Sequence, residues 1–308
     1  MAKMILTVED AKDRDKWQAI RRQGIGGSDI AAILGLSKWK SAWQLWNEKR
    51  GMVEDEDLSE NEYVYWGTVL EEVVANRFCE LTGKQVRKSG TLADDVYGYM
   101  HANVDRLVVG EKAGLECKTA NGFAAKAWAD DEVPTPYYLQ CQWYMMITGF
   151  EKWYIACLIG GNHFVWKEIP RNDEDIEAMR TAAIDFWDMV QTGRMPAVDG
   201  SASCSAALSA KFTPQPGLEI TLDDDDVERL ITLKAGLKEM EKAVAEAENT
   251  IKEKMGEAEI GTAGEHRITW KQQAGRVTVD AKRLKAAMPK IFEAYSKTGK
   301  PTRVFKVN

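Results

Sequence analysis

The 308-residue sequence has few cysteines and histidines and no long apolar run. Its five cysteines stand singly without a Cys-x-x-Cys pair, which disfavours a disulfide framework, a structural zinc site and a four-cysteine iron–sulfur cluster. The three histidines are too dispersed for a histidine-rich metal site. No run of 18 apolar residues occurs, so the sequence predicts no transmembrane helix.

The N-terminus also lacks the pattern of a signal peptide, because acidic residues appear within its first ten positions. We therefore expect an intracellular, cytoplasmic protein with reduced cysteines and no membrane partner. Hydrophobic residues make up 44% of the chain and charged residues 29%, which is typical of globular proteins. The length favours one large domain with an appendage.

The net charge of −7 weakly disfavours a nonspecific nucleic-acid coat. The charge is unevenly distributed, however, since residues 276–308 hold nine Lys and Arg against two acids, a local charge of +7. A local patch attracts a polyanion more than the total charge does. A nuclease therefore stays compatible with this composition.

The hydrophobic pattern predicts an α/β (α+β) region over residues 1–198. Helical spacing over 63–81 and 134–148 surrounds short strands over 84–118, and a hairpin is predicted over 153–169. Residues 199–222 are rich in Pro, Ala, Ser and Gly, which is typical of a linker. A C-terminal helical and hairpin extension is predicted over 223–308.

This extension begins with a long predicted helix over 223–255. Two interpretations stay open for its apolar face: pairing with a partner helix, or docking on its own domain. A hairpin over 266–279 and a helix over 281–295 are expected next. Apolar residues occupy a and d positions of nearly four heptads: Leu230, Leu233, Leu237, Met240, Val244, Ala247 and Ile251.

Two acids and a lysine form the pattern that points to chemistry. Asp105 precedes Glu116-Cys117-Lys118, and strand alternation places Glu116 and Lys118 on one face. Two carboxylates can bind Mg²⁺, the carbonyl of Cys117 can add a ligand, and an ammonium can orient water or stabilise negative charge. Metal-dependent phosphodiester hydrolysis requires such a set, although exposed hairpins also produce this pattern.

Further motifs flank these residues in a defined order. Arg21 precedes Gly-Ile-Gly-Gly-Ser-Asp at 24–29, Trp-Gly-x-x-x-Glu ends at Glu71, and Gln-x-x-x-Tyr spans 140–144. Over about residues 15–170, this order resembles the YqaJ-type viral recombinase and lambda-type exonuclease family of the PD-(D/E)xK nuclease superfamily. The resemblance implies a restriction-endonuclease-like core with a central mixed sheet flanked by helices.

The resemblance also implies roles for the matching residues. Two Mg²⁺ ions per site are implied, with Mn²⁺ as a substitute. Gln142 stays open as an alternative to the helper residue Gln140. The implied set comprises the metal ligands Glu71, Asp105, Glu116 and the carbonyl of Cys117, the catalytic residues Asp105, Glu116 and Lys118, and the helper Gln140.

In lambda-type enzymes an Arg and a Ser, seven residues apart, hold the 5′-phosphate of the DNA end. Arg21 and Ser28 have this spacing, with Arg22 as an alternative to Arg21. A further arginine and a serine of that pocket have no clear match, and Lys126 is the nearest cation. This departure leaves strict 5′ polarity open.

The resemblance implies a Mg²⁺-dependent exonuclease that digests the 5′ strand at double-stranded DNA ends. It also implies a phage or prophage context, a trimeric ring, and transfer of the exposed 3′ strand to a single-strand annealing protein. One alternative is a structure-specific or nicking endonuclease on the same core. A DNA-binding module with vestigial catalysis is a third hypothesis, which the intact acid–acid–lysine set disfavours.

Overall fold

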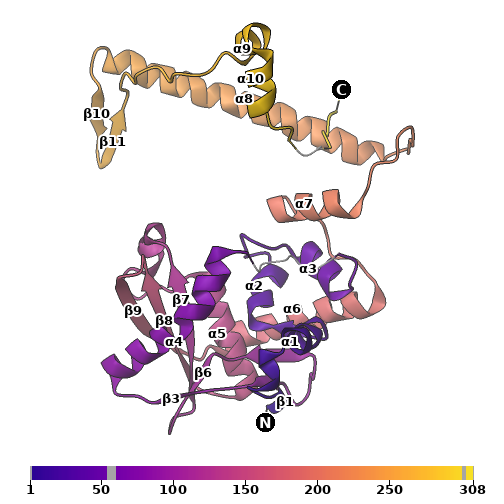
Figure 1. The fold of residues 1–308 in the computed structure, drawn as a ribbon, viewed down its shortest axis with the longest axis vertical. Helices are drawn as coiled ribbons and strands as arrows, with labels where there is room; N and C mark the ends of the chain where they lie inside the picture. Colours follow the sequence, from indigo (N-terminus) through magenta and orange to yellow (C-terminus); the bar gives the residue numbers. More distant parts are fainter. Residues whose placement is uncertain (1, 54–59, 300–302, 308) are drawn as a thin grey trace. The chain divides into compact units, whose positions relative to one another are not determined.

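The computed structural model describes residues 2–53, 60–299 and 303–307 and forms two compact units (Figure 1). The N-terminal unit spans Met1–Thr213, and the C-terminal unit spans Pro214–Asn308. None of the described helices has the length and apolar character needed to cross a bilayer.

A five-stranded mixed sheet forms the centre of the N-terminal unit. Strands β7 and β8 pair in parallel, and the other neighbours pair antiparallel. The predicted hairpin over 153–169 is confirmed, with its turn at Gly160 and Gly161. In spatial order the strands are β3 (Val86–Lys88), β6 (Arg106–Val108), β7 (Ala113–Ala120), β8 (Lys152–Ile159) and β9 (His163–Pro170).

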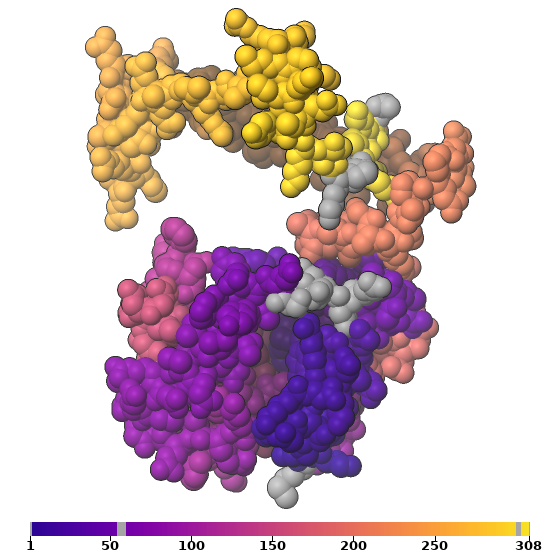
Figure 2. Space-filling model, viewed as in Figure 1, coloured from indigo at the N-terminus to yellow at the C-terminus, as the bar shows by residue number. Residues whose placement is uncertain are grey.

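A smaller sheet of four strands ties the N-terminal segment to residues 91–103. In Figure 2 this segment (indigo) packs directly against the part of the chain that follows it (purple). One strand of this sheet ends at Asn103, two residues before Asp105, so the sheet fixes the backbone that leads to Asp105. In spatial order the strands are β1 (Lys3–Leu6), β4 (Thr91–Ala93), β5 (Met100–Asn103) and β2 (Ile25–Gly26).

Helices cover both faces of the main sheet, as the predicted central mixed sheet requires. Leu115 and Cys117 of β7 pack with Val74 and Phe78 of α4 (Glu62–Thr82). The opposite face packs against α5 (Thr135–Thr148). The remaining helices of this unit are η1 (Asp10–Lys12), α1 (Arg14–Arg22), α2 (Gly27–Ile33), α3 (Ala42–Lys49), η2 (Gly122–Trp128), α6 (Asp173–Thr192) and α7 (Ala202–Lys211).

The segment predicted as a linker, residues 199–222, contains α7 and so differs from the prediction. Ser201 caps α7 by accepting the N–H of Cys204. Cys204 and Ala207 are buried against Trp43 of α3, and the N-terminal unit extends to Thr213 instead of ending at residue 198. Small residues suit a linker and also a helix that packs closely, so composition alone did not distinguish the two.

The C-terminal unit begins with the predicted long helix, α8 (Asp224–Met255), which is confirmed. The predicted hairpin forms earlier than expected, because β10 (Ile260–Ala263) pairs with β11 (His266–Thr269) and no strand covers 276–279. The predicted helix over 281–295 is divided into α9 (Ala281–Ala287) and α10 (Pro289–Tyr295). Pro289 explains this division, since proline interrupts a helix and starts the next one readily.

Candidate active site

The ends of β6 and β7 bring Asp105 close to Glu116. Oδ2 of Asp105 accepts the backbone N–H of Cys117 at 2.8 Å. The N–H and C=O of one strand residue point to the same side, so the carbonyl of Cys117 also faces Asp105. Glu116 and Lys118 lie on the α5 face of β7, opposite Cys117. The two carboxylates, this carbonyl and the ammonium therefore share one corner of the sheet.

Glu116 is 1% exposed, and its two carboxylate oxygens differ in their contacts. Oε1 accepts hydrogen bonds from Lys118 Nζ at 2.5 Å and from Gln140 Nε2 at 2.8 Å. Gln140 Oε1 in turn accepts from Lys118 Nζ at 3.2 Å. Oε2 is buried and has no hydrogen-bond partner among the described residues. A buried acceptor without a partner is costly, so this atom is placed to take a ligand.

Burial dominates the electrostatics of this corner. It raises the pKa of Asp105 well above its ordinary value, and the charge of Glu116 raises that pKa further. Burial also raises the pKa of Glu116, although Lys118 opposes this. Burial alone would lower the pKa of Lys118, but the charges of Glu116 and Asp105 raise it. Lys118 is therefore a cation at neutral pH, while the two acids favour a proton or another positive charge between them.

Glu71 points to a different partner from the one expected. Its Oε1 accepts from Nη1 of Arg106, whose guanidinium also donates to Glu72 and to the carbonyl of Asp105. The side chain of Arg106 is 3% exposed, so this ion pair is buried on the arginine side. Sequence analysis did not identify Arg106, and its position directly after Asp105 was the available signal.

Glu71 is thus paired with Arg106, while Asp105, Glu116 and the Cys117 carbonyl lie together. No group of three His, Cys, Asp or Glu side chains within the described part of the chain is arranged to hold a metal ion. Asp105, Glu116 and the Cys117 carbonyl nevertheless offer the oxygen ligands that Mg²⁺ takes, and Glu116 Oε2 has no other partner in the described residues. These three groups fit a divalent cation.

A second element of the site is the turn between α1 and α2. Nη2 of Arg21 lies 3.4 Å from Oγ of Ser28, and its guanidinium lies 5.1 Å from the ring centroid of Trp17. The structure thus places Arg21 beside Ser28. The position that the sequence assigned to a phosphate-binding pair therefore holds a cation next to a hydroxyl.

A buried ion pair fixes this turn. Asp29 is 2% exposed, accepts the N–H of Gly26 at 3.1 Å and lies 2.8 Å from Nζ of Lys49 on α3. Burial alone would raise the pKa of Asp29, but the charges of Lys49 and Arg21 lower it to about 2. Asp29 is therefore ionised at neutral pH and holds the turn between two helices.

Gly27 places the same turn directly against α5. A Cβ added at Gly27 would lie 2.8 Å from Cε1 of Tyr144 and 3.1 Å from Cγ of Gln140, closer than side chains tolerate. Gln140 also contacts Glu116. The Ser28 turn and the carboxylates are therefore parts of one site.

A cleft of about 220 Å³ adjoins this site, and its lining includes Trp17, Glu71, Thr91, Asn103 and Asp105. Oδ1 of Asn103 accepts the hydroxyl of Thr91 at 2.6 Å, while its Nδ2 lies 3.9 Å from a Cβ built on Gly26. The amide donor thus faces the Gly26–Ser28 turn. Sequence analysis assigned Asn103 no role, and its place two residues before Asp105 was the only signal.

Two other candidates lie away from these contacts. Gln142 donates to the carbonyl of Pro170 and accepts the N–H of Asn172, so it supports the fold, and Gln140 is the glutamine at the carboxylates. Lys126 is exposed on η2, and none of the contacts recorded for the described residues joins it to Arg21 or Ser28. Within the described structure, Lys126, the expected second phosphate-binding cation, therefore has no recorded contact with the turn.

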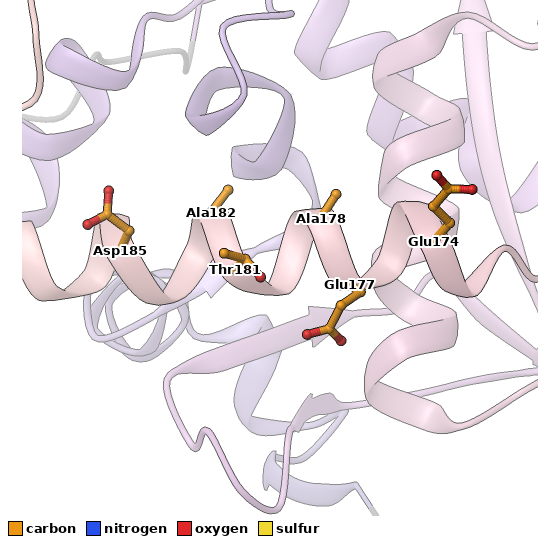
Figure 3. A pocket seen from close by; sticks show the side chains of 6 residues that line it. All are labelled: Glu174, Glu177, Ala178, Thr181, Ala182 and Asp185. Atoms are coloured by element: carbon orange, nitrogen blue, oxygen red, sulfur yellow. The ribbon is translucent and has the colours of Figure 1, made fainter.

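A shallow depression over α6 does not belong to this site (Figure 3). Its carboxylates would repel DNA, and Glu177 and Asp185 pair with Arg180 and Arg194. It contains none of the residues discussed above. It is lined by Glu174, Glu177, Ala178, Thr181, Ala182 and Asp185.

Comparisons with known proteins agree with the sequence motifs. A family model described as the YqaJ-like viral recombinase domain matches residues 16–151, which contain the site. The protein YqaJ of Bacillus subtilis (strain 168) is 39% identical over 301 residues, covering 95% of this chain and 94% of that protein. Protein D345L of African swine fever virus (strain Badajoz 1971 Vero-adapted) is 37% identical over 82 residues, 25% of this chain and 23% of that protein.

A likeness in fold extends to a solved structure. The alkaline exonuclease LHK-Exo of Laribacter hongkongensis is 20% identical and superposes with a TM-score of 0.51, covering 58% of this chain and 93% of that one. The predicted mixed α/β core is thereby confirmed. Together with the relative that matches nearly the whole chain, these findings show that the chain belongs to the YqaJ-like viral recombinase family.

Proposed function

We propose that the protein is a Mg²⁺-dependent DNA exonuclease that digests the 5′ strand of linear duplex DNA and exposes a 3′ single strand. The observation that carries this proposal is the corner shared by Asp105, Glu116 and Lys118, in which a buried oxygen of Glu116 has no partner among the described residues. Membership of a viral recombinase family supports a role in recombination.

The cation would be held by Asp105, Glu116 and the carbonyl of Cys117. We propose Mg²⁺ in this position, with Mn²⁺ as a substitute, and Glu71 as the residue that would turn from Arg106 to serve a second ion. When bound, a divalent cation supplies Lewis-acid stabilisation of negative charge on the scissile phosphate.

Lys118 supplies a second, fixed positive charge. Its Nζ is held by Glu116 and Gln140 and lies 4.9 Å from the ring centroid of Tyr137. Held in this way, the Lys118 ammonium would orient the attacking water and stabilise the phosphate by donating hydrogen bonds. Gln140 holds the Lys118 ammonium and the Glu116 carboxylate in place, because it hydrogen-bonds to both.

Strand polarity would come from the turn beside the carboxylates. Arg21, Ser28 and the amide of Asn103 present a cation and two polar groups next to Gly26 and Gly27. We propose that they bind the terminal 5′-phosphate. Since this turn packs on Gln140, a bound phosphate would place a nearby phosphodiester at Asp105 and Glu116.

Membership of the family supports a proposal for the wider role. We propose that the protein acts on double-stranded DNA ends in the host cytoplasm as a phage or prophage protein. A single-strand annealing protein would receive the 3′ strand, and the active form would be a homo-oligomer, a trimeric ring by resemblance to lambda-type enzymes.

The proposal is tested with three DNA substrates: linear duplex with a 5′-phosphate, the same duplex with a 5′-hydroxyl, and closed circular DNA. Each is incubated with Mg²⁺ or EDTA, with Glu116→Gln as the inactive control. We expect Mg²⁺-dependent release of nucleotides from the phosphorylated end. Arg21→Ala and Ser28→Ala should slow cleavage of that substrate much more than cleavage of the 5′-hydroxyl duplex.

The circular substrate decides the alternative function. Among the described residues, Arg21 contacts Ser28 at the turn, whereas no recorded contact joins Lys126 to it, and this difference is the observation that favours a structure-specific or nicking endonuclease. Cleavage of closed circles at a rate similar to that of linear DNA would favour the endonuclease and contradict the end-dependent mechanism. DNA binding without cleavage of any substrate would contradict both.

A further inference from the structure

The long helix α8 (Figure 1) carries an apolar face that the described residues of the C-terminal unit leave exposed. None of its described residues is buried, although the helix is 32 residues long. Leu233, Leu237, Met240 and Val244 are 52–65% exposed and follow one another at a and d spacing. Helices gain most of their stability from packing such a face, so α8 requires an occupant for it.

A glycine in the middle of α8 indicates how closely that occupant approaches. Gly236 lies next to Leu237 at an interior position, where glycine is unfavourable for a helix. A Cβ added at Gly236 would meet no described atom within 4 Å, and its φ is not positive. Within the described chain, nothing therefore requires glycine there. A second backbone packed beside this position explains it.

We propose that α8 pairs with α8 of a second copy of this chain as an antiparallel coiled coil. In the register that places Leu237 opposite Met240, the two-fold axis repeats each contact. The apolar residues then meet in three kinds of layer. These layers are Leu230 with Ala247, Leu233 with Val244, and Leu237 with Met240, each residue meeting one on the other copy.

Charges beside the apolar face favour this arrangement. Lys234 and Glu241 both occupy e positions, so Lys234 of each copy faces Glu241 of the other. On the other flank, Gly236 faces Ala243, and these two small residues permit a close approach. The ring of Phe305 lies 5.9 Å from Nζ of Lys234, and the lysine side chain stays exposed.

A parallel pair lacks this complementarity. It would place Arg229 of each copy beside Lys234 of the other, so like charges would meet on both flanks. Gly236 and Ala243 would then face Glu241 and Glu248, which gives no opposite-charge pair. The sequence of α8 thus selects the antiparallel orientation over the parallel one.

The first test is the mass of the full-length protein by sedimentation equilibrium. Leu237→Glu should abolish association through α8 and lower the mass to that of whatever assembly the N-terminal units form alone, which is half the mass when they do not associate. Lys234→Glu should weaken pairing at least tenfold, and Lys234→Glu combined with Glu241→Lys should restore it. Hydrolysis of a short duplex serves as the folding control. An unchanged mass in Leu237→Glu would overturn the proposal and indicate that α8 docks on its own chain.

The second test uses disulfide formation to report orientation. The double substitution Leu237→Cys and Met240→Cys should yield an intermolecular cross-link under mild oxidation, because these positions face each other across the axis. Leu237→Cys alone should cross-link poorly in the antiparallel pair. Efficient cross-linking of that single variant would indicate parallel helices and overturn the proposed register.

Discussion

At the scale of single residues, the buried carboxylates Asp105 and Glu116 separate binding from hydrolysis. Glu116→Gln and Asp105→Asn should each abolish cleavage while retaining DNA affinity, because an amide keeps the shape but removes a charge that a cation requires. Both residues are buried with raised pKa values, so neutral substitutes should also fold well. Cleavage assays and filter binding check this, with Glu174→Gln on α6 as a control. Activity within tenfold of wild type in both variants would contradict the metal-site assignment.

Lys118 tests the electrostatic part of the mechanism. Lys118→Ala should slow hydrolysis by on the order of 10²-fold or more, the usual scale for losing a charge-stabilising group. Because Lys118 lies outside the proposed ligand set, Mn²⁺ affinity measured by calorimetry should survive the change. A loss of metal affinity as large as that in Glu116→Gln would assign Lys118 to holding the site together instead.

The raised pKa values of Asp105 and Glu116 predict proton-linked metal binding. The ordinary pKa values of these two acids are 3.8 and 4.5. At a pH between these and their raised pKa values, the folded, metal-free protein holds protons that the unfolded chain has lost. Metal-free stability should therefore fall as pH rises through this window, while Mn²⁺ affinity should rise. Calorimetry in buffers of different ionisation enthalpy measures the released protons. Affinity that is independent of pH would contradict the buried, proton-sharing pair.

At the scale of secondary-structure elements, the sequence predicted what depends on local pattern. Periodicity identified α4, α5 and α8, and strand alternation placed Glu116 and Lys118 on one face of β7. It did not identify α7, because Ala and Ser are compatible with both linker and helix. The pairing of Glu71 with Arg106 and the orientation of the Asn103 amide depend on contacts between elements that are distant in the sequence. Spacing along the chain does not predict such contacts.

The turn between α1 and α2 provides a test at this scale, with a glycine in an exposed turn as the control. Gly27→Ala should push the turn away from α5, because its Cβ would lie 2.8 Å from Tyr144. Cleavage of 5′-phosphorylated ends should fall by about 10²-fold, the typical cost of a shift of about 1 Å in a substrate-positioning group. Gly98→Ala is the control, because a Cβ at this exposed glycine would meet no described atom within 4 Å and Gly98 lies outside the proposed phosphate site, so activity should persist. Equal activities in the two variants would show that the turn does not position DNA.

At the scale of the whole molecule, the boundary at Thr213 changes how the chain should be divided. A protein ending at Gly200 loses α7, and Trp43 then loses the cover of Cys204 and Ala207. A protein ending at Thr213 keeps every residue of the proposed site and the whole N-terminal unit. The longer fragment should therefore be the more stable of the two in thermal unfolding. Catalysis without the C-terminal unit should accordingly be measured on the fragment that ends at Thr213.

The fragment 1–213 also tests what the positive segment 276–308 contributes. It should retain metal-dependent hydrolysis of short duplex DNA but bind long DNA more weakly and less processively, because it lacks a segment with a local charge of +7. If that segment contacts phosphates, the full-length protein should lose affinity with salt more steeply, by about 0.9 in the logarithmic slope for each contact. Measuring affinity for long duplex over a salt series gives both slopes. Identical slopes would exclude DNA binding by residues 276–308 and leave docking of a recombination partner, or packing, as their role.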